Sequence, residues 1–307
     1  MEDLYPSRQL PEPSTLKRQD PVLHAEDFAD APISLDLVRQ YERDGFLVLE
    51  NVFNTEEVEA LKAEANRLRS GTPDLQEDTK ISEPDKTGED IVRSVFAIHN
   101  QSDVFGQLAA GERLAGLARF LLADDVYVHQ SRLNYKPAFR GKEFYWHSDF
   151  ETWHTEDGMP RMRALSMSVM LTDNHPQAGP TMFVPGSQET YIQCVGETPD
   201  DHYKSSLRRQ EYGVPDADNL REMIEGGGIA APAPKAGSVV VFDCNTMHGS
   251  NGNITPFERI NAFFVFNAWS NRLAAPFGNT SPRPEFIAHR DVNAPLPRPE
   301  KTRKRAA

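Results

Sequence analysis

Cysteines are scarce in this sequence: Cys194 and Cys244 are the only two among 307 residues. Two cysteines cannot build the disulfide framework of a small secreted protein, so we expect a reduced protein in the cytoplasm. The sequence also has no apolar run near the ~20 residues that are needed to span a bilayer. Its N-terminal stretch is polar and contains prolines, which is not typical of a signal peptide.

Basic residues are outnumbered by acidic ones. The chain has 33 Lys and Arg against 46 Asp and Glu, which gives a formal net charge of -13. This balance argues against a broad surface for nucleic acid or anionic membranes, so we expect neither as a partner. A hydrophobic content of 38% is ordinary for a globular protein, and the length allows one large domain or two small ones.

Helical patterns come first along the chain. Ser34 is a candidate N-cap for a helix that follows it, since apolar residues recur there at helical spacing. The stretch 54–70 has the clearest helical pattern, with apolar residues every three or four positions. We expect a second apolar helix at 111–123, a strand at 45–53 and a polar loop at 71–92.

Strand patterns dominate the second half of the chain. Apolar stretches separated by turn signals lie at 126–137, 163–173, 181–185, 237–244 and 259–269. Helices followed by irregularly spaced strands predict an α+β protein, mainly β, whose body is a β-sandwich or jelly roll.

We expect a single domain over residues 33–290. Residues 1–32 contain prolines and are predicted to form an extended N-terminal arm, and residues 291–307 a loose C-terminal tail. Within the domain, the mostly polar stretch 190–230 is predicted to be a long excursion from the barrel, or a lid.

The segment YWHSDF (145–150) places His147 and Asp149 two residues apart among aromatic side chains. On a strand, residues i and i+2 face the same way, so both side chains can reach one metal ion. His248 follows an apolar strand and precedes a turn, which makes it the best-placed third ligand. Two histidines and one carboxylate form the facial triad of non-haem Fe(II) oxygenases, although zinc hydrolases use similar ligands.

Arg259 begins a strand just beyond the turn that follows His248, and we expect it on the strand paired beside that histidine. A buried arginine needs an anion, and a bidentate guanidinium–carboxylate pair is its natural partner. A dicarboxylate bound to the metal at one end would place its other carboxylate there, as a 2-oxoglutarate enzyme requires. Alone, each feature is commonplace in structural roles; together they predict an oxygenase site.

These residues resemble the phytanoyl-CoA hydroxylase type of Fe(II)/2-oxoglutarate dioxygenases and, within that group, the ectoine hydroxylases. The similar segments are FYWHSDFETWHTEDGMPRMRALSMSVML (144–171), QSRLNYKP (130–137), GPTMFVPGSQ (179–188) and FDCNTMHGSNGN (242–253). The resemblance extends over about residues 30–290. Asp149 is present, whereas related halogenases have a small residue in place of that carboxylate, so we do not expect a halogenase.

The resemblance implies a double-stranded β-helix, cupin-like, with N-terminal helices packed outside it. The implied reaction converts ectoine, O2 and 2-oxoglutarate into 5-hydroxyectoine, succinate and CO2, which serves compatible-solute production under osmotic or heat stress. The triad would hold Fe(II), and Arg259, Ser250, Asn134 and Phe144 would bind 2-oxoglutarate. Gln130, Thr152, Trp153 and Asn261 would contact ectoine.

Ectoine is a zwitterion with a delocalised amidinium ring and one carboxylate. Such a ligand calls for an aromatic face beside the cation and a cationic group beside the carboxylate. Trp153, Phe242 and Phe263 are the aromatic candidates, and Arg132 is the candidate for the carboxylate. Arg132 alternates with Gln130 and Asn134, so all three should face one side of a strand. The aromatic residues could equally be core packing, and the polar ones could face solvent.

Two other functions remain open from the sequence. A related dioxygenase would hydroxylate proline, another small amino acid or an acyl substrate. A non-catalytic metal-binding barrel would hold a small solute without oxidising it. The resemblance also implies a homodimer.

Overall fold

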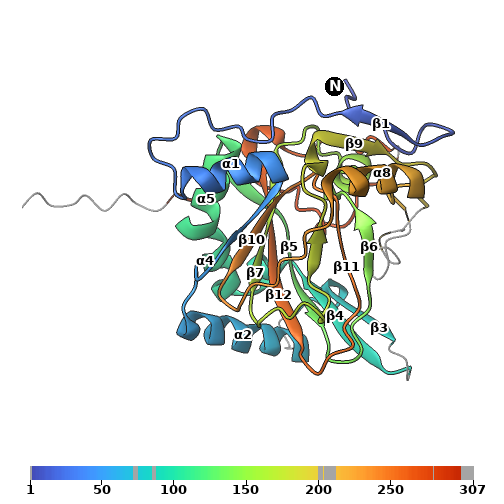
Figure 1. The fold of residues 1–307 in the computed structure, drawn as a ribbon. Helices are drawn as coiled ribbons and strands as arrows, with labels where there is room; N and C mark the ends of the chain where they lie inside the picture. Colours follow the sequence, from blue (N-terminus) through green and yellow to red (C-terminus); the bar gives the residue numbers. More distant parts are fainter. Residues whose placement is uncertain are drawn as a thin grey trace, which may run out of the picture.

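The computed structural model describes residues 2–71, 75–84, 88–199, 203, 212–278 and 280–298. Its body consists of two antiparallel sheets that face each other, with helices along the outside of the larger sheet (Figure 1). The predicted excursion at 190–230 and the predicted tail at 291–307 lie partly outside the described residues.

Within the described ranges, the larger sheet has seven strands. In spatial order these are β2 (Phe46–Leu49), β10 (Val239–Asp243), β7 (Ala164–Met170), β12 (Arg259–Ala268), β5 (Val126–Lys136), β4 (Asp90–Phe96) and β3 (Lys80–Pro84). The smaller sheet consists of β6 (Phe144–His147), β11 (His248–Ser250) and β8 (Thr181–Phe183). The rings of Phe183 and Phe242 join the two sheets, with centroids 5.2 Å apart. The facing sheets form a double-stranded β-helix, which confirms the predicted fold class.

Side chains of the larger sheet alternate between two environments. On β7, Leu165, Met167 and Val169 belong to the main hydrophobic core, whereas the Ser166 hydroxyl donates to the Asp149 carboxylate at 3.3 Å. This period of two puts an apolar core under the helices. It leaves a polar interior between the sheets, where the functional site lies.

Four helices cover the outer face of the larger sheet (Figure 1): α1 (Leu35–Asp44), α2 (Thr55–Ser70), α4 (Asp103–Ala110) and α5 (Leu117–Leu122). Helix α8 (Ala217–Gly227) lies elsewhere in the chain. The remaining helical segments are short: η1 (Glu77–Thr79), α3 (Ile98–Gln101), η2 (Glu112–Gly116), α6 (Asp149–Thr152), η3 (Trp153–Asp157), η4 (Ser187–Glu189) and η5 (Trp269–Asn271). Of these, η2 and η3 are π-helical turns.

The predicted helix starts are confirmed. Ser34 caps α1 by accepting the Leu37 N–H at 3.4 Å. Helix α2 begins with a capping box, in which the Asn54 side chain accepts the Glu57 N–H and the Glu57 carboxylate accepts the Asn54 N–H. The helix predicted at 111–123 is present as η2 followed by α5.

The predicted strands of the second half are confirmed as β5, β7, β8, β10 and β12. The polar loop predicted at 71–92 is wrong in part, because it contains β3 and the start of β4. β3 forms the edge of the sheet and is largely half-buried. An edge strand of this kind needs little apolar patterning, so its sequence resembles a loop.

Residues 2–32, predicted as an extended arm, lie against the body of the molecule. Their strand β1 (Ser14–Lys17) pairs with β9 (Thr190–Gln193). Arg8 and Arg18 each form a buried ion pair with the body. The arm therefore contributes charged side chains to the interior near the site.

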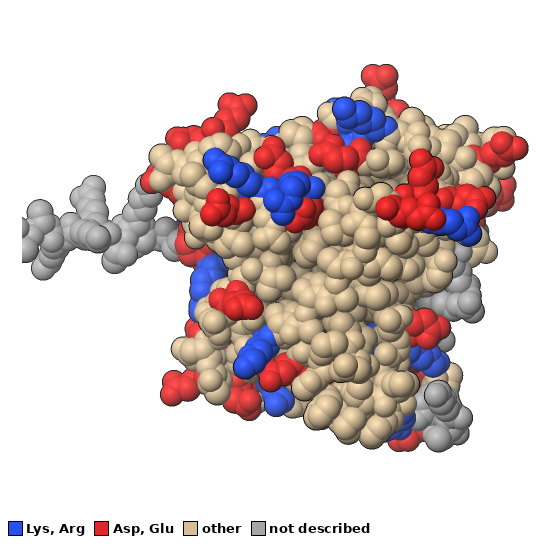
Figure 2. Space-filling model, in the orientation of Figure 1, with Lys and Arg blue, Asp and Glu red and all other residues tan. Residues whose placement is uncertain are grey.

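The surface carries both signs of charge. On the face shown in Figure 2, Lys and Arg side chains lie beside Asp and Glu side chains. Among the described residues, no helix has both the length and the apolar character that a membrane crossing needs.

Candidate metal centre and active site

A strand-to-helix corner carries the first two candidate ligands. β6 ends at His147, Ser148 is extended (φ -101°, ψ 130°), and α6 begins at Asp149. The prediction that both ligands lie on one strand is therefore wrong for Asp149, because the chain turns into a helix there. The corner still brings the side chains together, with 3.7 Å between His147 Nε2 and Asp149 Oδ1.

Strand β11 brings the third candidate ligand. His248 is the first residue of β11, at a strand end as predicted, and lies opposite His147 in the antiparallel pair with β6. Its Nε2 is 3.9 Å from Asp149 Oδ2. One ligand atom from each of the three residues lies within 4.8 Å of the others. The structure thus assembles the predicted triad into one compact group.

Both imidazoles are anchored through Nδ1. His147 Nδ1 is 2.8 Å from the Tyr145 carbonyl oxygen, and His248 Nδ1 is 2.9 Å from the Thr246 carbonyl oxygen. A carbonyl only accepts, so a neutral ring that makes this bond carries its proton on Nδ1. Each Nε2 is then free to ligate a metal ion from a fixed direction.

The electrostatics of the triad fit a metal ion. Burial alone would raise the pKa of Asp149, but His248, His147 and Arg132 hold that pKa below its usual value. Burial, reinforced by His147, lowers the pKa of His248 to about 4. Near neutral pH the carboxylate is ionised and the His248 imidazole is neutral, which are the states that ligate metals. This donor set fits Fe(II) with positions left open.

A cavity opens beside the triad between the two sheets. Most of the predicted site residues line it: His147, Asp149, His248, Arg259, Ser250, Asn134, Phe144, Gln130, Arg132, Thr152, Trp153 and Phe263. The predicted residues Phe242 and Asn261 are outside this lining.

Phe242 and Asn261 lie just behind the cavity wall. The ring of Phe242 packs against His248, with centroids 4.9 Å apart. Asn261 lies opposite Asn134 in the β12–β5 pair, so both side chains are on the same face. The Asn261 amide is fully buried, and neither its oxygen nor its nitrogen has a partner among the described residues. Such an unsatisfied amide is available to a ligand.

Arg259 reaches the cavity by a different route from the predicted one. β12 pairs with β5 and β7 in the larger sheet, so the expectation that Arg259 is on a strand beside His248 is wrong. Because the two sheets face each other, Arg259 and His248 line the same cavity from opposite sides.

The Arg259 end of the cavity is strongly cationic. Lys136 lies opposite Arg259 in the β5–β12 pair, and both are buried. Burial, with Arg93 nearby, lowers the pKa of Arg259 to about 10. Burial, Arg259 and Arg93 also lower the pKa of Lys136 well below its ordinary value. Within the described part of the chain no carboxylate pairs with Arg259 or Lys136, so this end calls for an anion.

Small polar groups complete the cationic end. Lys136 Nζ donates to Ser250 Oγ at 2.9 Å, and Arg259 donates to the Gly179 carbonyl oxygen. The Asn134 amide oxygen accepts from the Ser94 hydroxyl at 2.9 Å. The Phe144 ring stands edge-on to His147, with centroids 4.9 Å apart, and lines the same cavity.

The other end of the cavity combines aromatic faces with polar groups. Gln130, Arg132 and Asn134 share one face of β5, as predicted. The Arg132 guanidinium lies 5.0 Å from the centroid of the Phe263 ring and donates to Gln130. Trp153 is held edge-on by the His129 ring at 5.3 Å. The Thr152 hydroxyl is buried with no partner among the described residues.

Sequence reasoning missed several residues that line the cavity. Lys136 continues the alternation of Gln130, Arg132 and Asn134, so the same period of two could have found it. Arg93 and Ser94 lie on β4, directly after the stretch predicted as loop. Glu156 and Arg283 also line the cavity, from the π-helical turn η3 and from a coil segment that has no periodic pattern.

Several known proteins are similar to this chain in sequence. The sequence matches the family described as phytanoyl-CoA dioxygenase (PhyH) over residues 41–261. An ectoine dioxygenase of Sphingopyxis alaskensis is 58% identical over 296 residues, which are 96% of each chain. An ectoine dioxygenase of Halomonas elongata is 50% identical over 94% of this chain and 86% of its own length.

A solved structure is also similar. EctD from S. alaskensis, crystallised with 2-oxoglutarate and 5-hydroxyectoine, superposes with a TM-score of 0.87 at 53% identity, covering 96% of this chain and 97% of that one. This chain therefore belongs to the phytanoyl-CoA dioxygenase family, the Fe(II)/2-oxoglutarate dioxygenases, and within it to the ectoine dioxygenases.

Proposed function

We propose that this protein hydroxylates ectoine to 5-hydroxyectoine, with Fe(II) as cofactor and 2-oxoglutarate and O2 as cosubstrates. The observation that carries this function is one cavity with a 2-His-1-carboxylate group and a cationic end, in which Arg259 and Lys136 have no carboxylate in an ion pair among the described residues. The identity of the substrate is supported by relatives named ectoine dioxygenase, which match nearly the full chain. The physiological role would be compatible-solute production under osmotic or heat stress.

The triad would bind the metal ion, and the cationic end would bind the distal carboxylate of 2-oxoglutarate. His147, Asp149 and His248 would hold Fe(II), which together with 2-oxoglutarate and O2 supplies the oxidising power for the reaction. Arg259 would pair with the distal carboxylate of 2-oxoglutarate through two parallel N–H bonds. Lys136, which lies opposite Arg259 and donates to Ser250, would contact the same carboxylate together with Ser250. Asn134 and Phe144 would confine the chain of the cosubstrate.

The opposite end of the cavity would hold ectoine. Arg132 would pair with the ectoine carboxylate, and the faces of Trp153 and Phe263 would cover the amidinium ring. Gln130, Thr152 and Asn261 would supply hydrogen bonds, since Thr152 and Asn261 have buried groups without partners among the described residues. Phe242 would act from behind, by fixing the ring of His248. These contacts would aim one C–H bond of ectoine at the metal side of the cavity.

The direct test is product analysis. Purified protein loaded with Fe(II) should convert ectoine, 2-oxoglutarate and O2 into equal amounts of 5-hydroxyectoine and succinate. If the protein is a dioxygenase, Asp149→Ala should abolish both products. If it is a solute-binding barrel instead, the wild type should form neither product, and Asp149→Ala should keep the affinity for ectoine. Consumption of proline or another small amino acid in preference to ectoine would contradict the proposal and favour a related dioxygenase.

We further propose that the protein is a cytoplasmic homodimer. The two cysteines of the protein are both buried and unpaired, which supports a location in the reducing cytoplasm. The dimer rests only on the family resemblance. Light scattering coupled to size-exclusion chromatography should give twice the 34.5 kDa of one chain, and a monomer at all concentrations would contradict it.

A further inference from the structure

Asn245 lies in the turn between β10 and β11 and is almost completely buried. Its Nδ2 donates to the carbonyl oxygens of Gln188 and Thr190 at 2.9 and 3.1 Å, and its Oδ1 accepts from Ser148 Oγ at 2.9 Å. Carbonyl oxygens only accept, so these contacts determine which way the amide points. Both hydrogens of the Asn245 amide donate to carbonyl oxygens, so these bonds hold the turn in one conformation.

The partner of Asn245 stands inside the metal-binding corner. Ser148 is the residue between His147 and Asp149. A second bond joins the same two segments, because the Phe150 N–H donates to the Cys244 carbonyl oxygen at 2.8 Å. The corner with the first two ligands is therefore tied on both sides of Asp149 to the turn that leads into His248.

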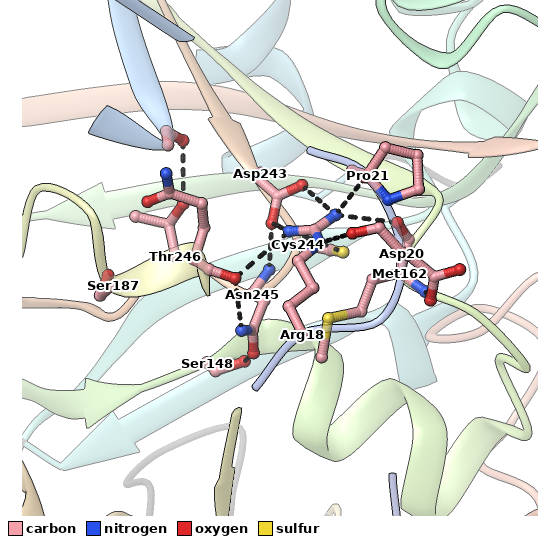
Figure 3. A network of polar contacts seen from close by, with 12 residues as sticks. Arg18, Asp20, Pro21, Ser148, Met162, Ser187, Asp243, Cys244, Asn245 and Thr246 are labelled. Atoms are coloured by element: carbon pink, nitrogen blue, oxygen red, sulfur yellow. Dashed lines mark hydrogen bonds and ion pairs between the residues drawn. The ribbon is translucent and has the colours of Figure 1, made fainter. Parts of the chain in front are cut away.

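The N-terminal arm fixes this turn from outside. Arg18 binds the Asp243 carboxylate with two bonds, of 2.6 and 3.0 Å, and both side chains are buried. The same carboxylate accepts the Asn245 N–H at 2.8 Å. Figure 3 shows the resulting chain of contacts, which runs from Arg18 through Asp243 and Asn245 to Ser148.

We propose that Asn245 and Ser148 are positioning residues for the metal site, and that Arg18 of the arm holds Asn245 in place through Asp243. Neither Asn245 nor Ser148 lines the cavity. They act by keeping the corner and β11 at one separation, so that His147, Asp149 and His248 present their ligand atoms together. Groups just outside a ligand shell typically contribute about 10- to 100-fold in metal affinity.

The experiment titrates the metal-free, full-length protein with Co(II) and follows the visible absorption of the bound ion. Ser148→Ala and Asn245→Ala should weaken Co(II) binding by about 10- to 100-fold. Their spectra at saturation should differ from the wild type, because Co(II) absorption depends on ligand geometry. Ser148→Thr keeps the hydroxyl and should restore both readouts. None of these readouts depends on ectoine, so this experiment tests the positioning residues independently of the proposed substrate.

Asn271→Ala is the matched control. Asn271 is also buried, and its side chain also makes three hydrogen bonds, all to Arg161 or Asn267. This variant should lose thermal stability but keep the Co(II) affinity and spectrum. Folded Ser148→Ala with wild-type affinity and spectrum would overturn the proposal, and so would an equal loss in Asn271→Ala. If Asn245→Ala does not fold, Ser148→Ala decides alone, since it removes a single hydroxyl.

Discussion

At the scale of single residues, the most informative feature is a pair of buried cations without a counter-ion. Arg259 and Lys136 face each other across β12 and β5, and within the described ranges neither has a carboxylate partner. Burying two like charges costs stability unless an anion joins them. A cavity that holds both side chains is therefore suited to bind an anion, and we propose the distal carboxylate of 2-oxoglutarate as that anion.

Arg259→Lys should weaken the binding of 2-oxoglutarate although it preserves the charge. An ammonium group cannot form the two parallel bonds of a guanidinium, and a charged hydrogen bond contributes about 1.5–3 kcal/mol. The KM for 2-oxoglutarate should rise by about 10- to 150-fold. The affinity for Co(II) and the KM for ectoine should stay near the wild type. An unchanged KM for 2-oxoglutarate would remove Arg259 from the cosubstrate site.

Lys136 should make the binding of 2-oxoglutarate dependent on pH. In the free protein its pKa is well below the ordinary lysine value, and a bound carboxylate would raise that pKa again. Between the two pKa values binding takes up a proton, so affinity falls as pH rises through the pKa of the free protein. Calorimetry in buffers of different ionisation enthalpy measures this uptake. Lys136→Met should abolish it; uptake that persists in this variant would assign the proton to another group.

At the scale of elements, the sequence predicted regular strands well and special connections poorly. Alternation along β5 placed Gln130, Arg132 and Asn134 on one face, because a strand that lines a polar cavity repeats its pattern every two residues. The corner at Ser148 has no such repeat, so Asp149 was wrongly assigned to a strand. The predicted strand pairing of Arg259 is wrong for another reason. Strand pairing is a long-range property that spacing along the chain does not encode.

The segment α6–η3 illustrates how the arm supports the site. It carries Thr152 and Trp153 into the cavity, and Arg8 of the arm holds it at two points. The guanidinium of Arg8 lies 2.7 Å from Glu151 and 2.7 Å from Glu156, with all three side chains buried. Since π-helical turns such as η3 are intrinsically rare, this external support helps to keep the turn in shape.

Arg8→Met should strongly destabilise the protein, because it leaves the buried carboxylate of Glu151 without a cation and removes the nearer of two cations from Glu156, whose other partner, Arg283, is 3.9 Å away. The expected loss in free energy of unfolding is about 3–5 kcal/mol, measured by urea denaturation of the metal-free protein. Arg113→Met is the control: Arg113 pairs with Glu57 at 2.6 Å, but their side chains are 49% and 35% exposed. Arg113→Met should lower the free energy of unfolding by only about 0–1 kcal/mol. Equal losses in the two variants would show that the arm is not a structural support.

At the scale of the whole molecule, the site spans the gap between the two sheets. The metal-binding histidines belong to β6 and β11 of the smaller sheet, whereas Arg259 and Lys136 belong to the larger one. A dicarboxylate that ligates the metal and reaches Arg259 therefore connects the sheets. Its binding free energy adds directly to the stability of the folded state.

Thermal unfolding in the presence of a redox-inert divalent ion should reveal this connection. At a hundredfold excess over its Kd, 2-oxoglutarate should stabilise the fold by about 2.7 kcal/mol, which corresponds to a rise in Tm of about 5 °C. Pyruvate offers the same keto acid to the metal but has no distal carboxylate, so at equal concentration it should raise Tm far less. Arg259→Lys should shrink the response to 2-oxoglutarate and leave the response to pyruvate unaltered. If pyruvate stabilised the wild type as much as 2-oxoglutarate does, the cosubstrate would be held by the metal alone, and the two sheets would not be linked through it.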